Sequence, residues 1–598
     1  FAQASPSDFT SATRYDGAQR ITGTIAPDPD GAGPLHHLAV RNSYDVAGRL
    51  IRVEKGELTA WMSEDIKPAD WSLYTTFTIA QQTDTAYDAM DRKIREDVSS
   101  GGVTYQVTQY SYDTAGRLEC AAVRMNPAAF GSLPASACTL GAQGSQGPDR
   151  ITKNVYDATG QLLQVRKAVG TSIEQAYTTY SYTANGKQEY VVDANGNKAR
   201  LVYDAYDRQV QWQFPSTGVP GGYDGSTPAS ALATSGAVNS NDREEYGYDA
   251  NGNRTSLRKR DGRVFGYTFD ALNRMTSKIV PTACVAGYAC TSVNPSATRS
   301  VYYSYDLRGL QTAARFDSTS GADAVTSAYD GFGRQTSSTT SMAGTSRQFT
   351  YGYDANGNRT RVTHPDGHSV NYYRDGLDRL YYADLDGSIG LFYPPYDGGG
   401  RVSTLYRWSQ ASGAWSFGTN YGYDGISRLT NYVHSFSSGG NVSTGLAYNP
   451  VSQIVSRTRD NDDYRFTGHV NADRNYAVNG LNQYSSVAGM AFGYDTNGNL
   501  ISDGATSYVY DAENRLVASS AGVKLVYDPL GRLYQVDRFG VSDTRFLYDG
   551  DALTAEYDGS GNLLKRYVHG AADGVDGPLV EFAGTSLSPR YLFTDHQG

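Results

Sequence analysis

The sequence predicts an all-β fold, in which a long meandering antiparallel sheet of hairpins is coiled into a hollow spiral shell or barrel. Three observations support this prediction. A Tyr-Asp-x-x-Gly-Arg unit recurs about twenty times along the chain. The segments between the units alternate aromatic with short polar residues, as half-buried strands do. No segment has the apolar stripe of a helix, so we expect less than roughly a tenth of the residues to be helical.

Each copy of the unit has the residue types of a hairpin turn. Tyrosine ends a strand with a large half-buried ring, and aspartate caps the amides of the turn. Glycine, or its substitutes Asn and Asp, takes the position with positive φ, and arginine opens the return strand. The clearest copies are Tyr44, Asp45, Gly48 and Arg49; Tyr112, Asp113, Gly116 and Arg117; Tyr329, Asp330, Gly333 and Arg334; and Tyr527, Asp528, Gly531 and Arg532.

The spacing of the units sets the expected size of the sheet. Neighbouring tyrosines lie roughly twenty residues apart, which is the length of one hairpin, and a second turn such as Pro365-Asp366-Gly367 closes the opposite end. About forty strands at ~4.8 Å give a ribbon about 190 Å long. Because sheets twist, such a ribbon must coil, and one closed turn about 60 Å across is too wide for side chains to fill. A hollow structure is therefore expected.

Composition excludes several classes of protein. The 598 residues are 39% hydrophobic and 19% charged, with 48 tyrosines and no stretch long and apolar enough for a transmembrane helix. The net charge of −10 is spread evenly, without a basic run, so we expect no nucleic-acid partner. The small-x-small pattern of Ala2-Gln3-Ala4 indicates export, although cleavage there would have removed Phe1. We therefore expect a secreted, extracellular or cell-surface protein.

The four cysteines fall into two local pairs, Cys120 with Cys138 and Cys284 with Cys290. Each pair brackets an insertion rich in Pro, Ala and Gly between strand-like segments, which suits two local disulfides. Three pairings of four cysteines exist, and four free thiols are the alternative. Neither spacing is Cys-x-x-Cys, so zinc and thioredoxin-like chemistry are not expected.

The repeats, together with an ordered tail, resemble the Rhs and YD-repeat family of polymorphic toxins, toxin-complex shells and teneurins. The tail is Arg566-Tyr567-Val568-His569-Gly570, then Asp576-Gly577-Pro578-Leu579-Val580, then Tyr591 to Gly598. We expect an N-terminal segment (1–14), a YD-repeat β-shell (15–565) and the start of an Rhs core tail (566–598). The resemblance implies a cocoon that holds a C-terminal effector domain of the same polypeptide and delivers it to another cell.

Two parts of the family pattern are missing from these residues. The family's closing segment, where self-cleavage releases the toxin, does not follow the Asp595-His596-Gln597-Gly598 stretch, and no delivery domain precedes the repeats. Autoproteolytic residues therefore cannot be assigned. We expect the parent polypeptide to continue past Gly598 into that closing segment and an effector.

The sequence predicts no catalytic residue, no metal site and no cofactor, and hence a non-enzymatic scaffold. His364 and His368 have the spacing of a helical metal site, but Pro365-Asp366-Gly367 between them demands a turn. The alternative is an adhesin or structural surface protein that binds a glycan or receptor, because exposed aromatic rings can stack on sugars. Its candidate rings are the many tyrosines and the tryptophans Trp61, Trp71, Trp212, Trp408 and Trp415.

Overall fold

The computed structural model describes residues 10–31, 33–281, 298–410, 412–436, 439–570 and 577–596. Strands account for 51% of the chain and helices for 4%, which confirms the predicted all-β class and its low helical content. The largest sheet has 32 strands, and a further sheet of nine strands comprises β38 to β46. Cys284 and Cys290, and the residues at both ends of the chain, lie outside the described part.

The chain divides into two compact units, each made of two separate segments. Unit 1 comprises Phe1–Tyr177 and Asn371–His469, and unit 2 comprises Thr178–Val370 and Val470–Gly598. Each unit therefore combines an earlier and a later stretch of repeats. Strand β1 begins at Ala12, within the segment 1–14, and strand β44 runs across residue 566, where the tail was expected to begin.

The elements of the first segment of unit 1 are β1 (Ala12–Tyr15), β2 (Ile21–Ile25), β3 (His37–Tyr44), β4 (Leu50–Leu58), η1 (Pro68–Asp70), α1 (Trp71–Tyr74), β5 (Phe77–Tyr87), β6 (Lys93–Ser100), β7 (Val103–Tyr112), β8 (Leu118–Val123), η2 (Pro127–Ala129), β9 (Arg150–Tyr156) and β10 (Leu162–Lys167). Strands β11 (Gln175–Tyr182) and β25 (Ser369–Arg374) contain the unit boundaries. The later segment of unit 1 has β26 (Leu380–Leu385), β27 (Ile389–Tyr393), β28 (Thr404–Ser409), β29 (Ala414–Tyr423), β30 (Leu429–Ser435), β31 (Val442–Tyr448), β32 (Ile454–Arg459) and η4 (Asp462–Tyr464).

The first segment of unit 2 has β12 (Gln188–Asp193), β13 (Lys198–Tyr203), β14 (Gln209–Pro215), α2 (Pro228–Thr234), β15 (Val238–Tyr248), β16 (Arg254–Arg258), β17 (Val264–Phe269), β18 (Met275–Ile279), β19 (Val301–Tyr305), β20 (Gln311–Phe316), β21 (Ala324–Tyr329), β22 (Gln335–Met342), β23 (Thr345–Tyr353) and β24 (Arg359–Thr363). Its later segment has β33 (Tyr476–Val478), β34 (Tyr484–Val487), β35 (Met490–Ala491), β36 (Gly493–Tyr494), β37 (Leu500–Ser502), β38 (Tyr508–Tyr510), β39 (Leu516–Ser519), β40 (Val523–Tyr527), β41 (Leu533–Arg538), β42 (Val541–Asp549), β43 (Ala552–Asp558), β44 (Leu563–His569), β45 (Pro578–Ala583) and β46 (Arg590–Tyr591).

Successive strands pair antiparallel, as the repeat predicts for a meander. The register shifts by one residue where a strand reaches its motif tyrosine. At the end of β5, for example, Ala86 pairs with Arg95 but Tyr87 pairs with Lys93. The same shift precedes Tyr112 and Tyr329. An extra residue on one strand is a β-bulge, which bends the strand and re-aims its side chains. The bulge therefore sets the direction of each motif tyrosine.

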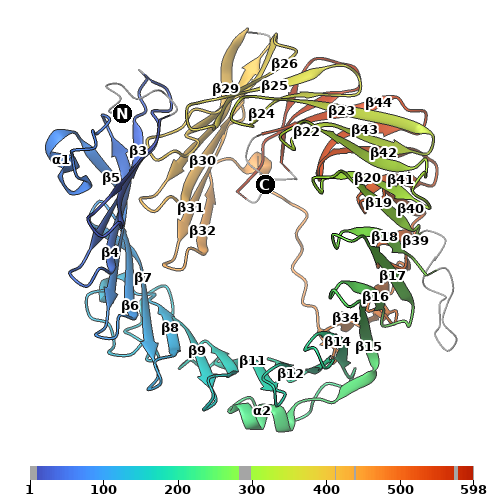
Figure 1. Cartoon of the computed structure of the whole chain (residues 1–598), viewed down its shortest axis with the longest axis horizontal. Helices are drawn as coiled ribbons and strands as arrows, with labels where there is room; N and C mark the ends of the chain where they lie inside the picture. The colour runs from blue at the N-terminus through green and yellow to red at the C-terminus, as the bar shows by residue number, and fades with distance from the viewer. Residues whose placement is uncertain are drawn as a thin grey trace. The chain divides into compact units, whose positions relative to one another are not determined.

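Separate small cores replace the single core of a compact domain. In unit 1, Trp71 of the short helix α1 is fully buried and packs edge-on against Phe77, together with Ile25 and Leu58. Figure 1 shows α1 (blue) beside β5. Gly23 lies directly beneath the Trp71 ring, where an added Cβ would come within 2.7 Å of it. The Trp71 indole therefore packs on the first strands at Gly23, where the sheet has no side chain.

In unit 2 the nine-stranded sheet packs against strands of the earlier segment. Tyr534 of β41 joins a buried cluster with Val301, Phe316 and Met342. Figure 1 shows β42 to β44 (red) alongside β22 and β23 (green to yellow). Repeats separated by about two hundred residues in the sequence are thus packed together in this unit.

Candidate functional site

Each motif aspartate holds its own turn closed. Asp45 accepts hydrogen bonds through Oδ1 from the amides of Ala47 (3.0 Å) and Arg49 (2.9 Å), and through Oδ2 from Nε of Arg49 (2.7 Å). The Arg49 amide and then its guanidinium lower the pKa of the Asp45 carboxyl. Gly48 in this turn has φ +86°, in the left-handed region that favours glycine. The turn is thus fixed by the residue types that the sequence singled out.

The other clear copies of the motif have the same geometry. Gly116, Gly333 and Gly531 have φ of +83°, +82° and +86°. In their turns, Asp113, Asp330 and Asp528 each accept the arginine Nε four residues on, at 2.7 to 2.8 Å.

The motif arginine also joins its turn to the next one. Arg49 donates from Nη1 to the carbonyl oxygen of Asp88 (3.0 Å), and its guanidinium lies over the Tyr87 ring at 5.1 Å. The Tyr87 hydroxyl in turn donates to the carbonyl of Leu50, the residue after that arginine (3.0 Å). A stacked guanidinium and two hydrogen bonds therefore link neighbouring repeats, in addition to the strand pairing.

We call this chain of contacts the tyrosine-arginine ladder. It recurs with ring distances of 4.0 to 5.1 Å at Arg20 with Tyr44, Arg92 with Tyr112, Arg117 with Tyr156, Arg208 with Tyr248, Arg274 with Tyr305, Arg334 with Tyr353, Arg379 with Tyr396, Arg401 with Tyr423, Arg428 with Tyr448, Arg515 with Tyr527 and Arg532 with Tyr548. Burial raises the pKa of seven of these tyrosines, which are Tyr112, Tyr305, Tyr396, Tyr423, Tyr448, Tyr527 and Tyr548, in the last case to about 12. Their phenols therefore stay protonated and able to donate.

The ladder is what sequence reasoning missed. Tyr and Arg were assigned to the ends of strands in their own hairpin, whereas their contacts reach the adjacent hairpin. The signal that could have revealed it is the recurrence of an arginine in one copy and a tyrosine in the next copy, which lies 12 to 40 residues later.

A second set of contacts joins the two segments of unit 2. The Tyr351 hydroxyl donates to Oδ1 of Asp549 (2.9 Å), and Arg359 forms an ion pair with the same carboxylate. Burial, followed by the negative charge of Asp549, raises the pKa of Tyr351. Arg566, which is 1% exposed, is paired with Asp366. We call this group of three residues and this pair, together with the contacts described next, the interlayer contacts.

Each further interlayer contact includes a turn residue, which pairs with another turn residue or with a strand residue. Asn497 and Asp261 form a reciprocal pair, in which the Asn497 amide donates to Asp261 Oδ2 (2.8 Å) and the Asp261 backbone amide donates back (3.1 Å). Lys278 lies 2.7 Å from Glu513 in an ion pair with both side chains largely buried. These contacts each join one particular repeat to one other.

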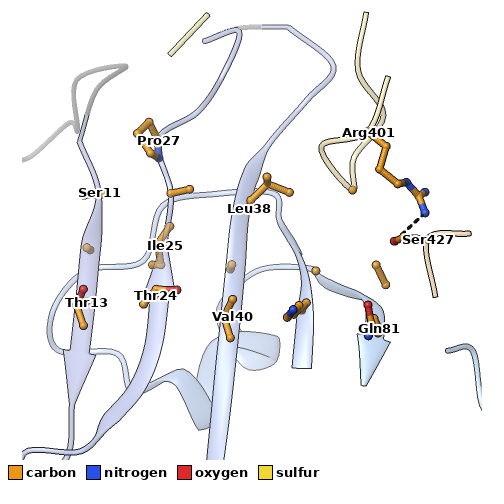
Figure 2. A pocket seen from close by; sticks show the side chains of 17 residues that line it. Ser11, Thr13, Thr24, Ile25, Pro27, Leu38, Val40, Gln81, Arg401 and Ser427 are labelled. Atoms are coloured by element: carbon orange, nitrogen blue, oxygen red, sulfur yellow. Dashed lines mark hydrogen bonds between the residues drawn. The ribbon is translucent and has the colours of Figure 1, made fainter. Parts of the chain in front are cut away.

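In unit 1 a YD turn packs on the face of the first strands. Figure 2 shows the resulting pocket of about 440 Å³, with Ile25, Leu38 and Val40 on one side and Arg401 on the other. Arg401 donates to the Ser427 hydroxyl (3.2 Å) as well as to its own turn aspartate. None of the lining residues is His, Cys, Asp or Glu.

Cys120 and Cys138 form a disulfide, with their Cα atoms 5.3 Å apart. Cys120 is fully buried in a cluster with Ala122 and Ile151. The bond ties the insertion that follows β8 to the sheet.

Comparisons with known proteins agree with the repeat pattern. Residues 246–282 and 329–369 match the family model described as RHS Repeat. The tRNA nuclease WapA of Bacillus subtilis (strain 168) is 24% identical over 35% of this chain and 10% of its own length. The tRNA(Glu)-specific nuclease WapA of Bacillus subtilis subsp. natto is 35% identical over 16% of this chain and 4% of its own. The chain therefore contains RHS repeats and is similar to proteins of the Rhs/YD-repeat family.

A solved structure of the Photorhabdus luminescens Tc holotoxin pore has the same fold as this chain. The superposition covers 96% of this chain and 31% of that one, with 14% sequence identity and a TM-score of 0.56. This chain therefore spans about a third of the matched toxin chain and a tenth or less of the two WapA nucleases. In the described part of this chain, no helix has the length and apolar character needed to cross a membrane.

The residues considered for metal and glycan binding are placed as follows. The backbone amide of His364 donates to the carbonyl of His368 (2.8 Å), so the two histidines close a turn rather than share a helix face. Among the described residues, no group of three His, Cys, Asp or Glu side chains could hold a metal ion. Trp71 is buried, whereas Trp408 and Trp415 contact each other with ring centroids 5.1 Å apart.

Proposed function

We propose that this chain is shell material of an Rhs-type toxin that encloses an effector domain of the same polypeptide and delivers it to another cell. The observation that carries the proposal is the fold likeness to the Tc holotoxin pore over 96% of the chain. The chain itself would perform no chemistry. Because delivery to another cell takes place outside the producing cell, the role also implies a secreted or cell-surface protein.

The side-chain contacts suit a wall that must stay closed. A sheet of many strands held only by backbone pairing exposes each strand to local opening. The tyrosine-arginine ladder adds a side-chain link at successive turns, and the interlayer contacts in unit 2 fasten one run of repeats to another. Such redundancy supports a container, because the loss of a single link leaves its neighbours in place.

The relatives support an effector in the parent protein. The WapA proteins are described as tRNA nucleases, and most of their length lies outside the part that matches this chain. We propose that an effector activity of this kind would reside in a part of the parent polypeptide other than these repeats.

The test begins with the reading frame beyond Gly598. An effector domain encoded downstream supports the proposal, and an immediate stop codon refutes enclosure of a C-terminal cargo. The second step is to express the complete natural polypeptide and treat it with a protease, before and after unfolding in urea. An enclosed effector resists cleavage until the repeats unfold, whereas an effector cut at once from native protein refutes enclosure.

A further inference from the structure

Arg566 in unit 2 is a buried cation that uses only part of its hydrogen-bonding capacity. It lies on β44, is 1% exposed and pairs through Nη2 with Asp366, in the turn after β24. Its Nε and Nη1 have no hydrogen-bond partner among the described residues. An unpartnered donor inside a protein costs free energy, because it has lost its hydrogen bonds to water. The Arg566 guanidinium therefore indicates a bound acceptor.

Arg124 in unit 1 shows how the chain satisfies a buried arginine with its own groups. This side chain is 2% exposed. Its Nε donates to Oε1 of Gln109 (3.1 Å), and its Nη2 donates to the same oxygen. Its Nη1 donates to the Thr139 carbonyl (2.8 Å) and to the Asp149 carboxylate (2.6 Å). All three nitrogens of Arg124 thus have acceptors from the chain, whereas two of the three in Arg566 have none among the described residues.

A second buried arginine, Arg347, lies beside Tyr557, which the charge of Arg566 also reaches. Arg347 is on β23 and 8% exposed, and its guanidinium lies over the Tyr557 ring at 3.8 Å. Of the two arginines, only Arg566 forms an ion pair with a described carboxylate. Burial raises the pKa of Tyr557, and Asp366 acts in the same direction, whereas the two arginines oppose them. Two cations and one carboxylate are therefore grouped near this phenol.

The nearest carboxylates along the strands do not compensate for the second cation. Successive side chains of a strand point to opposite faces of its sheet. Glu556 precedes Tyr557 on β43, so it points to the opposite face, where it accepts the Tyr567 hydroxyl (2.7 Å). Glu581 pairs with Tyr567 in the strand register and lies on that same face, in an ion pair with Lys565. An excess of one positive charge therefore remains on the buried side.

We infer that unit 2 binds a chloride ion beside Arg347 and Arg566, between its earlier and later segments. A buried charge without a counter-charge is strongly destabilised, and a monovalent anion removes the excess. Water would satisfy the free donors of Arg566 but would leave the charge uncompensated. Sulfate would bring two negative charges against an excess of one. Chloride carries one charge, accepts hydrogen bonds from any direction and needs little room.

The chloride ion would also link the two segments of unit 2. Arg347 belongs to the segment Thr178–Val370, and Arg566 belongs to Val470–Gly598. An anion that both guanidinium groups attract stabilises the folded state in proportion to its concentration over its dissociation constant. Opening of β44 should therefore depend on chloride.

The experiment follows hydrogen exchange of the full chain in about 100 mM sodium chloride and in sodium gluconate of the same concentration. Gluconate has the same charge but is too large for a buried site. Peptides covering residues 563–569 should exchange about tenfold more slowly in chloride, as expected when the ion is at about ten times its dissociation constant.

The variant Arg347→Gln removes the excess charge and should abolish the chloride effect. In gluconate its residues 563–569 should exchange no faster than those of the parent, because no uncompensated cation remains. A purely structural role of Arg347 would instead accelerate exchange equally in both salts, which would overturn the inference. The matched control is Arg538→Gln, which removes an exposed arginine of the same unit and should keep the tenfold effect.

Three further results overturn the inference. Equal exchange of the parent in chloride and gluconate would assign the free donors of Arg566 to water. A chloride effect that persists in Arg347→Gln would place the ion elsewhere. Stronger protection by sulfate than by chloride at equal ionic strength would contradict a site for a single negative charge. None of these outcomes depends on enclosure of an effector, so the proposed function is tested separately.

Discussion

Removing the Tyr351 hydroxyl tests whether the interlayer contacts hold the two segments of unit 2 together. Tyr351 lies on β23, is 8% exposed and donates to Asp549 at the end of β42. The substitution Tyr351→Phe deletes the hydroxyl and leaves the ring in place. We expect β42 and β43 to open more often, with no change in the β22 to β24 pairing.

The structure sets the size of the effect. A hydrogen bond between a buried donor and a charged acceptor contributes about 1.5–3 kcal/mol. Arg359 still pairs with Asp549 in the variant, so the carboxylate is not left alone and the lower part of that range applies. A loss of about 1.5–2 kcal/mol corresponds to a ten- to thirtyfold increase in the population of the open state, since about 1.4 kcal/mol is a factor of ten.

Hydrogen exchange followed by mass spectrometry measures this opening directly, and it does so without assuming that a chain of two units unfolds in one step. Peptides that cover residues 541–558 should exchange about ten to thirty times faster in Tyr351→Phe. The matched control is Tyr353→Phe, two residues along the same strand. Its hydroxyl donates to the Gln335 carbonyl (2.8 Å) within the same layer, so exchange in 541–558 should stay as in the parent.

Two outcomes would refute the reasoning. Exchange in 541–558 that rises less than about threefold in Tyr351→Phe would mean that the hydrogen bond to Asp549 contributes little. Equal acceleration by Tyr351→Phe and Tyr353→Phe would mean that the effect spreads through the sheet rather than across the layers.

The remaining predictions concern single turns and the disulfide. Gly333→Ala should lower the free energy of unfolding, measured in urea, by about 1 kcal/mol, because φ is +82° at this position. Gly331→Ala in the same turn should leave it unchanged, because this glycine has no positive φ and open space around its Cα. The Cys120–Cys138 disulfide links residues 18 apart in sequence, so its loss in Cys138→Ser should destabilise the insertion that follows β8 by about 3 kcal/mol. A rate of proteolysis in this insertion that stays unchanged in Cys138→Ser would contradict the prediction. The pKa of Asp45 is lowered from 3.8 in the folded chain, so the stability that its ionised carboxylate gives the fold is complete above about pH 5 and is lost as the pH falls below about 4. A melting temperature that rises on acidification would contradict this prediction.

The sequence was sufficient for the local fold because each hairpin is coded locally. The positive φ of Gly48 and the capping by Asp45 follow from a few adjacent residues. The bulge before Tyr87 was not foreseen, since the motif shows which residues turn but not the register of the strands that follow. The contact between Tyr351 and Asp549 joins residues 198 apart in sequence, and a periodic pattern gives no sign of which repeats meet.

Periodicity itself explains why the interlayer contacts need residues that differ from one repeat to the next. The ladder is nearly the same at each turn, so sliding one segment by a whole repeat would preserve it and leave the packing ambiguous. Asp549, Arg566 and Asn497 break this equivalence, because each finds its partner at one position on the other segment. A buried charge that meets the wrong repeat remains unpaired, which costs several kcal/mol. Residues that differ between repeats therefore select one register in unit 2, while the recurring motif contacts stabilise the sheet.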